Sequence, residues 1–421
     1  MEEENKITEG QTEHSSSVQT DDIAPTKRKK GGANNCKQLE VEDLNAPLKA
    51  KPKSKSGKIW TILFILLNVA VITYTAIADF SNEATPDTPT ALKVISENWY
   101  YLIFAIIAFT AGIVLEAGKL SFMMHRTTGK GRFKLCFQTM IFGKYYDGVT
   151  PLASGGQPFQ IYHLSKNGVK TGKATSIIIT SFFLNQLTFT ILCIIACVLD
   201  STGVLNCAEI FAAEGSTMRG NFEILRIFSY VGIALGAIVP LSILLFFVFP
   251  SGSIKLMKGG IALLSKLRII KNKEIATMKT IRTTAQSSRS IKEIAGSFWT
   301  LVPSLLFSIA LNCAACSVTY FTLRFFGFDI PNVNGIHEWL LIAQLHLFIS
   351  SAVSMVPTPG TSGAADFTFY SAFNELILVP GLSFTAMITW RFLSYYIYIL
   401  IGLVTLAYVS LKKKRLEKKA Q

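Results

Sequence analysis

Charged side chains that lie within or beside long apolar stretches are the residues most able to do chemistry in this sequence. They are Glu116, Lys144, Asp147, Asp366, Glu375 and Arg391. A charge at the centre of an apolar helix in a bilayer costs about 2.5 to 3.5 kcal/mol, so such side chains are expected to be paired, hydrated or functional. Lys144 and Asp147 are three residues apart, which would place them on one helix face as a local pair.

Arg391 has the most specific chemistry among these charged residues. Its guanidinium donates hydrogen bonds in pairs and therefore suits a carboxylate or a phosphate. We expect it to meet Asp366, Glu375 or a bound phosphate. Glu116 and Arg324 lie near the ends of apolar stretches, where long side chains can carry their charges toward water.

Two segments rich in proline and glycine, 143–159 and 356–366, interrupt the apolar pattern. Proline removes a backbone donor and stops a helix, and glycine permits close backbone approach. Helices that begin after these glycines would offer free N–H donors and a positive dipole end to a phosphate. The predicted binding residues are Asp147, Thr150, Pro151, Gly155, Gly156, Gln157, Pro158, Pro357, Pro359, Gly360, Gly363, Asp366 and Arg391.

Other classes of site find little support in the sequence. The seven cysteines are scattered and mostly lie in apolar runs, which argues against a disulfide scaffold. Cys313 and Cys316 form a C-x-x-C pair within an apolar segment, without a second pair to complete a metal site. We found no nucleotide-binding loop, catalytic triad or Cys/His cluster, and so expect no metal and no cofactor.

The composition indicates a polytopic membrane protein. Of the 421 residues, 50% are hydrophobic and only 16% are charged, whereas soluble domains have roughly 25% charged residues. The mean hydropathy is +0.39. A spanning helix needs about 20 apolar residues, and its backbone must be hydrogen-bonded internally. These values favour membrane helices over a soluble enzyme.

The pattern predicts an all-α fold with about six full spans and two re-entrant helical hairpins, eight helical elements in total. The hairpins contain the two interrupted segments, since each of these segments begins and ends on one side of the membrane. The predicted spans are 59–78, 98–115, 174–199, 227–254, 294–323 and 392–411.

Loop charges predict the orientation of these elements. Basic loops favour the cytoplasmic side. They include the loop after the second span, to which we assign Lys119, and the loop 251–296. The loops 79–97 and 200–226 are mostly acidic and are expected outside. Both termini are then cytoplasmic, and the net charge of +14 reflects topology rather than a nucleic-acid partner.

The two halves of the transmembrane domain, 58–200 and 224–411, have opposite predicted topology. The first hairpin enters from the inside and the second from the outside. Inverted repeats with interrupted helices at matching positions are typical of transporters whose site lies near the membrane midplane. Residues 1–57 are expected to be a disordered cytoplasmic tail and 412–421 a basic cytoplasmic tail, both near anionic lipid.

Both interrupted segments also carry a family resemblance. The pattern Thr150-Pro151-x-x-x-Gly155-Gly156-Gln157-Pro158, followed by Leu164-x-x-x-Gly168, resembles the transmembrane domain of the lysylphosphatidylglycerol synthetase/flippase family, the multiple peptide resistance factor. The pattern Pro357-x-Pro359-Gly360-x-x-Gly363-Ala364-Ala365-Asp366 is similar to its second signature, and Arg391 fits the arginine at the start of its last span. The resemblance covers residues 58–411.

The resemblance implies lipid transport in a bacterial-type cell membrane. Full-length members join a flippase region to a soluble lysyl-transferase domain, for which this chain, ending at Gln421, has no room. We expect a flippase-like protein that moves phosphatidylglycerol or lysylphosphatidylglycerol between leaflets. The alternatives are a phosphatidylglycerol lysyltransferase, which would confer resistance to cationic peptides, and a membrane subunit that recruits a separate lipid aminoacyltransferase. Phospholipid headgroups are the expected partners, and direct nucleic-acid binding is not expected.

The predicted topology can be tested by single-cysteine accessibility. Cysteines at the mouths of the 143–159 and 356–366 hairpins should react with an impermeant maleimide from opposite faces of the membrane, because loop charge places the mouths on opposite sides. Labelling of both mouths from the same face would rule out the inverted repeat.

Overall fold

Helices form the regular elements in the part of the chain that the computed structural model describes. The described residues are 66, 88–150, 153, 155–207, 217–248, 296–328, 330, 333, 335–354, 356, 358–361, 363–373, 377 and 382–420. The predicted tail 1–57, the predicted first span 59–78 except Leu66, Pro151, Pro357, Glu375 and nearly all of the loop 251–296 lie outside them. The prediction of an all-α protein is confirmed.

The helices follow the apolar runs, and the breaks between them follow glycine and proline. In chain order they are α3 (Thr88–Glu97), α4 (Trp99–Thr128), α5 (Phe133–Val149), α6 (Gly156–Lys166), α7 (Thr171–Ser201), α9 (Thr217–Val248), α12 (Phe298–Phe325), α13 (Gly335–Val353), the 3₁₀ turn η2 (Pro359–Thr361), α14 (Ala364–Phe373), α15 (Ser383–Arg391), the π-helical η3 (Phe392–Tyr396) and α16 (Ile397–Ala420). The elements α15, η3 and α16 follow one another without a gap and form one continuous helix.

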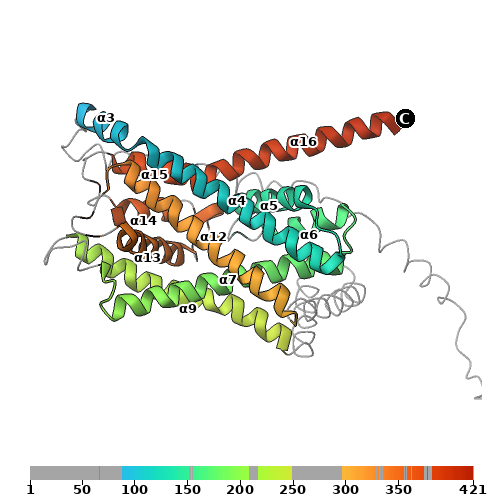
Figure 1. Ribbon diagram of the computed structural model, residues 1–421, viewed down its shortest axis with the longest axis horizontal. Coiled ribbons are helices and arrows are strands. Elements are labelled where there is room, and N and C mark those ends of the chain that lie inside the picture. Colours follow the sequence, from blue (N-terminus) through green and yellow to red (C-terminus); the bar gives the residue numbers. More distant parts are fainter. Residues whose placement is uncertain are drawn as a thin grey trace, which may run out of the picture. The chain divides into compact units, whose positions relative to one another are not determined.

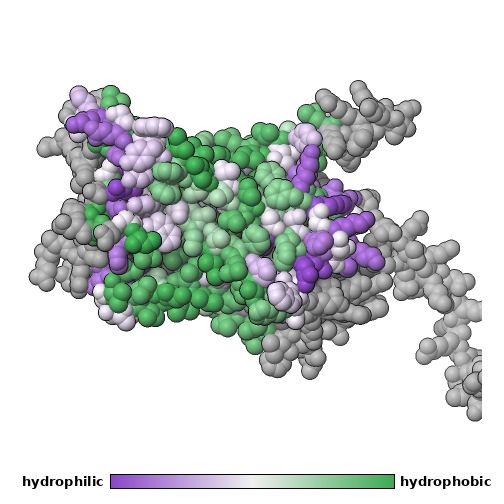
Figure 2. Space-filling model, in the orientation of Figure 1, coloured by the Kyte–Doolittle hydropathy of each residue, from purple (hydrophilic) through white to green (hydrophobic). Residues whose placement is uncertain are grey.

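Six helical stretches within the described residues are long and apolar enough to cross a membrane. They are α4, α7, residues 222–245 of α9, α12, α13 and residues 383–409. On the face drawn in Figure 2, apolar residues cover the middle and hydrophilic residues gather toward both ends. The chain is therefore a multi-pass membrane protein. The number of stretches equals the number predicted, but α13 replaces the 59–78 span, which lies outside the described residues.

The two predicted hairpins correspond to α5 with α6 and to α13 with α14; the helices of each pair pack against each other, and α13 is itself long and apolar enough to cross a membrane. In Figure 1, α6 lies toward the end of the helices where α4 finishes, whereas α14 lies toward the end where α3 and α15 are found. The hairpins thus approach from opposite ends of the spanning helices. This arrangement agrees with the inverted repeat expected from the sequence.

Two hydrophobic clusters form the core, one around each hairpin. One contains Met123, Met140 and Ile177 from α4, α5 and α7. The other is larger and includes Phe369 of α14 and Trp390 of α15, whose rings stack with centroids 4.5 Å apart. Each hairpin is therefore held by apolar packing against spanning helices, which leaves its turn to be satisfied by polar contacts.

The end of α4 corrects one prediction about loop charge. We assigned Lys119 to a basic cytoplasmic loop, but α4 continues to Thr128 and ends at Gly129, whose φ of 75° terminates it. Lys119 therefore lies within the helix, and none of its surface is exposed. Its positive charge belongs to the interior of the protein.

The crossing of α9 over α13 is unusually close. Ser229 Oγ donates a hydrogen bond to the carbonyl oxygen of Phe348 at 2.9 Å. A Cβ atom added to Gly232 would overlap the backbone of Ser351. Glycine is needed at 232 because any side chain would push the helices apart.

We expect Gly232→Ala to lower the melting temperature of the detergent-solubilised protein, because overpacking costs about 1 to 3 kcal/mol. Gly220→Ala on the same helix is the matched control, since no atom lies within 4 Å of its added Cβ. There alanine should be neutral or stabilising, by up to about 1 kcal/mol. Equal melting temperatures for the two variants would contradict the close crossing.

Candidate functional site

The turn of the first hairpin is capped by its own side chains. Asp147 accepts a hydrogen bond from the Gly156 N–H at 2.8 Å, and Thr150 Oγ1 accepts one from the Gly155 N–H at 2.9 Å. Thr150 Oγ1 in turn donates to the carbonyl oxygen of Tyr146 at 2.7 Å. Side chains thus bind two of the N–H groups at the start of α6.

The turn of the second hairpin repeats this chemistry. The Gly363 N–H donates to Asp366 Oδ2 at 3.0 Å, and both Gly360 and Gly363 have positive φ, 59° and 87°. The N–H groups of Gly155, Gly156 and Gly363 are thus occupied by Thr150, Asp147 and Asp366, so these three donors are not free for a phosphate. The role of these residues in substrate binding stays a prediction.

Arg391 ties the second hairpin to the last span. Its Nε lies 3.0 Å from Asp366 Oδ1, and its Nη2 donates to the carbonyl oxygen of Gly360 at 2.8 Å. Its side chain is 5% exposed, so the charge is held inside the protein. Asp366 is one of the three partners that we expected, and Glu375, another, lies outside the described residues. One guanidinium therefore anchors both sides of the turn.

Tyr395 links the two hairpin turns, which we did not predict. Its hydroxyl donates to the carbonyl oxygen of Gly148 in α5 at 2.9 Å. A Cβ on Gly360 would overlap its ring, which also lies 4.4 Å from the Arg391 guanidinium carbon. Tyr395 belongs to η3, and π-helical turns are frequent at functional sites. The only sequence signal was its position four residues after Arg391, on the same helix face.

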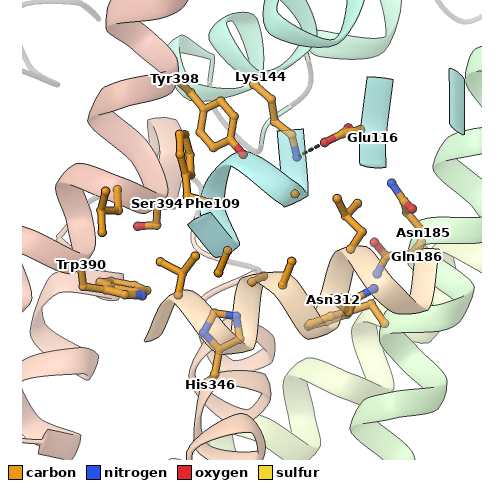
Figure 3. A pocket seen from close by; sticks show the side chains of 18 residues that line it. Phe109, Glu116, Lys144, Asn185, Gln186, Asn312, His346, Trp390, Ser394 and Tyr398 are labelled. Carbon is orange, nitrogen blue, oxygen red and sulfur yellow. Dashed lines mark ion pairs between the residues drawn. The ribbon is translucent and has the colours of Figure 1, made fainter. Parts of the chain in front are cut away.

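A cavity of about 330 Å³ with a mixed polar and apolar lining lies where helices of both halves meet. Glu116 Oε2 and Lys144 Nζ form an ion pair across it at 3.2 Å (Figure 3). Asn185, Gln186, Asn312, His346, Trp390, Ser394 and Tyr398 are the other polar or aromatic side chains labelled around it, together with Phe109. Cation, anion and amide groups are thus gathered within the membrane region.

The partners of these charges differ from those expected. Lys144 pairs with Glu116 rather than with Asp147, whose carboxylate caps α6. Arg324, in the last turn of α12, pairs with the buried Glu338 in the first turn of α13 at 3.2 Å. These pairs join residues from different helices, so spacing along one helix could not reveal them.

A second cavity, of about 460 Å³, continues from the same ion pair. It shares Glu116, Lys144, Asn185 and Gln186 with the first cavity. Its remaining lining includes Asp147, Ala153, Gln157 and Gln160 of the first hairpin and Ser354, which follows α13 in the second. The two hairpin turns therefore border one polar space, and two of the predicted residues, Asp147 and Gln157, line it.

Lys119 is a second cation, buried behind the wall of this space and bound to Asn185, which lines it. Its Nζ hydrogen-bonds to Asn185 Oδ1 and lies 3.4 Å from the Ser181 carbonyl oxygen and 3.3 Å from Ser308 Oγ. These partners are neutral oxygens, and within the described residues no ion pair joins Lys119 to a carboxylate. The sequence analysis missed this site because it counted Lys119 among the basic residues of a loop.

The two remaining predicted prolines have structural positions. Pro158 lies in the first turn of α6, where a missing N–H leaves no hydrogen bond unmade. Pro359 begins η2. Among the described residues, no group of three or more His, Cys, Asp or Glu side chains could hold a metal ion. The chemistry available in the cavities is therefore charge pairing and hydrogen bonding.

Comparison with known proteins gives two matches. The family model described as lysylphosphatidylglycerol synthase TM region matches residues 59–402. A UPF0104 membrane protein of Archaeoglobus fulgidus is 23% identical over 334 residues, which are 75% of this chain and 89% of that protein. No solved structure matches the chain.

We expect Arg391→Met to destabilise the protein strongly, because breaking a buried pair leaves Asp366 charged and unpaired, at a cost of about 3 to 5 kcal/mol. Asp366→Asn added to Arg391→Met should recover part of that loss. Thermal unfolding in detergent of the wild type, both single variants and the double variant gives the coupling energy. Strictly additive effects would show that the pair makes no net contribution.

Proposed function

From the premise that the chain belongs to the lysylphosphatidylglycerol synthase TM region family, we propose that it is a flippase-like lipid transporter. It moves phosphatidylglycerol or lysylphosphatidylglycerol between the leaflets of the cell membrane, with both termini in the cytoplasm. The observation that carries the proposal is the polar space around Glu116 and Lys144, bordered by the turns of both hairpins. Phospholipid headgroups are its proposed ligands.

A polar space inside the membrane is what headgroup transfer requires. The hydrocarbon core is about 30 Å thick and offers no hydrogen bonds. A headgroup can cross it only along polar or hydrated groups, whereas the acyl chains can stay in the surrounding lipid. The two cavities, which meet at the ion pair, supply such groups at the level where the hairpins converge.

Lys144 is the proposed phosphate-binding residue. Its side chain is 37% exposed and that of Glu116 is 12% exposed, so the ammonium group is accessible from the cavity. A lipid phosphate can take the place of the Glu116 carboxylate, because both are anions that accept hydrogen bonds from an ammonium group. The amides of Asn185 and Gln186 lie on the same wall and can bind the remaining headgroup oxygens.

The contacts of Arg391 and Tyr395 suggest how the path is controlled. Together they join the second hairpin, the last span and the end of α5 through Asp366, Gly360 and Gly148. Movement of one hairpin relative to the other must break some of these contacts. Transporters with inverted repeats alternate access by such movements of one repeat against the other.

We predict that Lys144→Met reduces lipid transfer at least tenfold in proteoliposomes containing only this protein. A hydrogen bond to a charged group contributes about 1.5 to 3 kcal/mol, and about 1.4 kcal/mol corresponds to tenfold. Lys144→Arg should retain part of the activity. Transfer is measured as the fraction of fluorescent phosphatidylglycerol that an impermeant quencher can no longer reach.

The matched control is Lys93→Met in α3, where the side chain is 74% exposed and pairs only with Glu97 of its own helix. It should transfer lipid like the wild type at equal reconstitution. Wild-type transfer by Lys144→Met would remove Lys144 from the site. Failure of the wild type itself would favour a membrane subunit that serves a separate synthase.

A further inference from the structure

An apolar cavity of about 420 Å³ lies apart from the polar space, between α9, the end of α13 and α14. Binding sites for small molecules occupy about 300 to 1,000 Å³, so its size suits a ligand. Its lining is Phe222, Ile224, Leu225, Phe228, Ala352, Val353, Val356, Ala364, Phe367, Thr368, Ser371 and Ala372. Only two of these side chains, Thr368 and Ser371, are polar.

Exposed apolar side chains form the margin of the cavity. Ile224, Phe228 and Phe367 are at least half exposed at its margin, whereas Val353 and Ala372 are buried within it. Residues 222–245 of α9 are a membrane-spanning stretch. In a multi-pass membrane protein, the medium beside such a margin is the hydrocarbon of the bilayer.

The apolar cavity and the polar space lie on either side of the close α9–α13 crossing. Along α9, Leu225 and Phe228 line the apolar cavity, Ser229 and Gly232 make the crossing, and Gly236 lines the polar space. After the end of α13, Ser354 lines the polar space and Val356 lines the apolar cavity. An apolar site beside a polar one has the amphipathic character of a phospholipid.

We propose that the apolar cavity binds one acyl chain of a membrane phospholipid. Because bilayer hydrocarbon is as apolar as the cavity, binding gains no hydrophobic free energy and depends on van der Waals packing. The cavity must therefore select the chain by shape, and saturation at modest lipid fractions is the expected behaviour. The idea that a lipid enters the polar space by way of this cavity rests on the proposed function. The idea that the cavity binds an acyl chain does not depend on that function.

The test uses a phosphatidylglycerol with a diazirine in the middle of one acyl chain, reconstituted with the full-length protein. After irradiation, mass spectrometry maps the labelled peptides. Labelling of residues 222–228 and 364–372 should saturate as the probe fraction rises. Labelling around Ile194, an exposed apolar residue of α7, should increase linearly, because it reports bulk lipid.

Ser371→Phe should fill the cavity and reduce the saturable labelling severalfold, whereas Ile194→Phe, the matched control, should leave it unchanged. If Ser371→Phe lowers expression or monodispersity, Thr368→Phe fills the same cavity from the preceding turn of α14. Linear labelling of the cavity peptides would overturn the proposal. A folded cavity-filling variant with the same saturable labelling as the wild type would also overturn it. The proposal would fail as well if another part of the chain were found to fill the cavity and keep the lipid probe out.

The transfer assay separates this proposal from the proposed function. Saturable labelling without lipid transfer by the wild type would support the chain-binding site and count against the transporter. Transfer without saturable labelling would support the transporter and overturn the chain-binding site.

Discussion

Two unwound turns lie within the membrane region, and their backbone groups must find hydrogen-bond partners inside the protein. Asp147 and Thr150 bind the N–H groups of two glycines in the first turn, and Asp366 and Arg391 bind an N–H group and a carbonyl oxygen in the second. These same side chains fix where the turns can lie, because the second pair also connects to the last span. The arrangement of the polar space follows from how the two turns are capped.

Burial of charge follows a similar logic elsewhere in the described structure. Arg324 is paired with Glu338, Arg226 with Asp200, and Lys144 with Glu116. Lys119 differs, since neutral oxygens surround its ammonium group. A positive charge balanced by dipoles leaves a net positive field in its surroundings, and this field favours an anionic group in the neighbouring space.

Composition and the proline–glycine segments were enough to predict helices, re-entrant hairpins and their opposite directions, because the bilayer allows few structures. The ion pair of Lys144 with Glu116 was not predictable, since it depends on which helices become neighbours in space. The burial of Lys119 was missed because the predicted span ended at residue 115, whereas α4 continues to Thr128 and includes Lys119. The N–H groups of Gly155 and Gly156 show that a nearby side chain can occupy a backbone donor, which the sequence motif alone does not reveal.

The π-helical segment Phe392–Tyr396 sets the rotational phase of the last helix. A π turn closes a hydrogen bond one residue later than an α turn, and each residue of a helix advances it by about 100°. The wide turn therefore reorients every side chain that follows it. Arg391, before the turn, reaches the second hairpin, while Tyr398, after it, lines the cavity near Lys144. A regular helix of the same length would turn Tyr398 away from Lys144 by about 100°. Deleting one residue of the π turn would restore a regular helix and keep Tyr398 facing Lys144, because the wide turn holds back about the rotation that one residue adds.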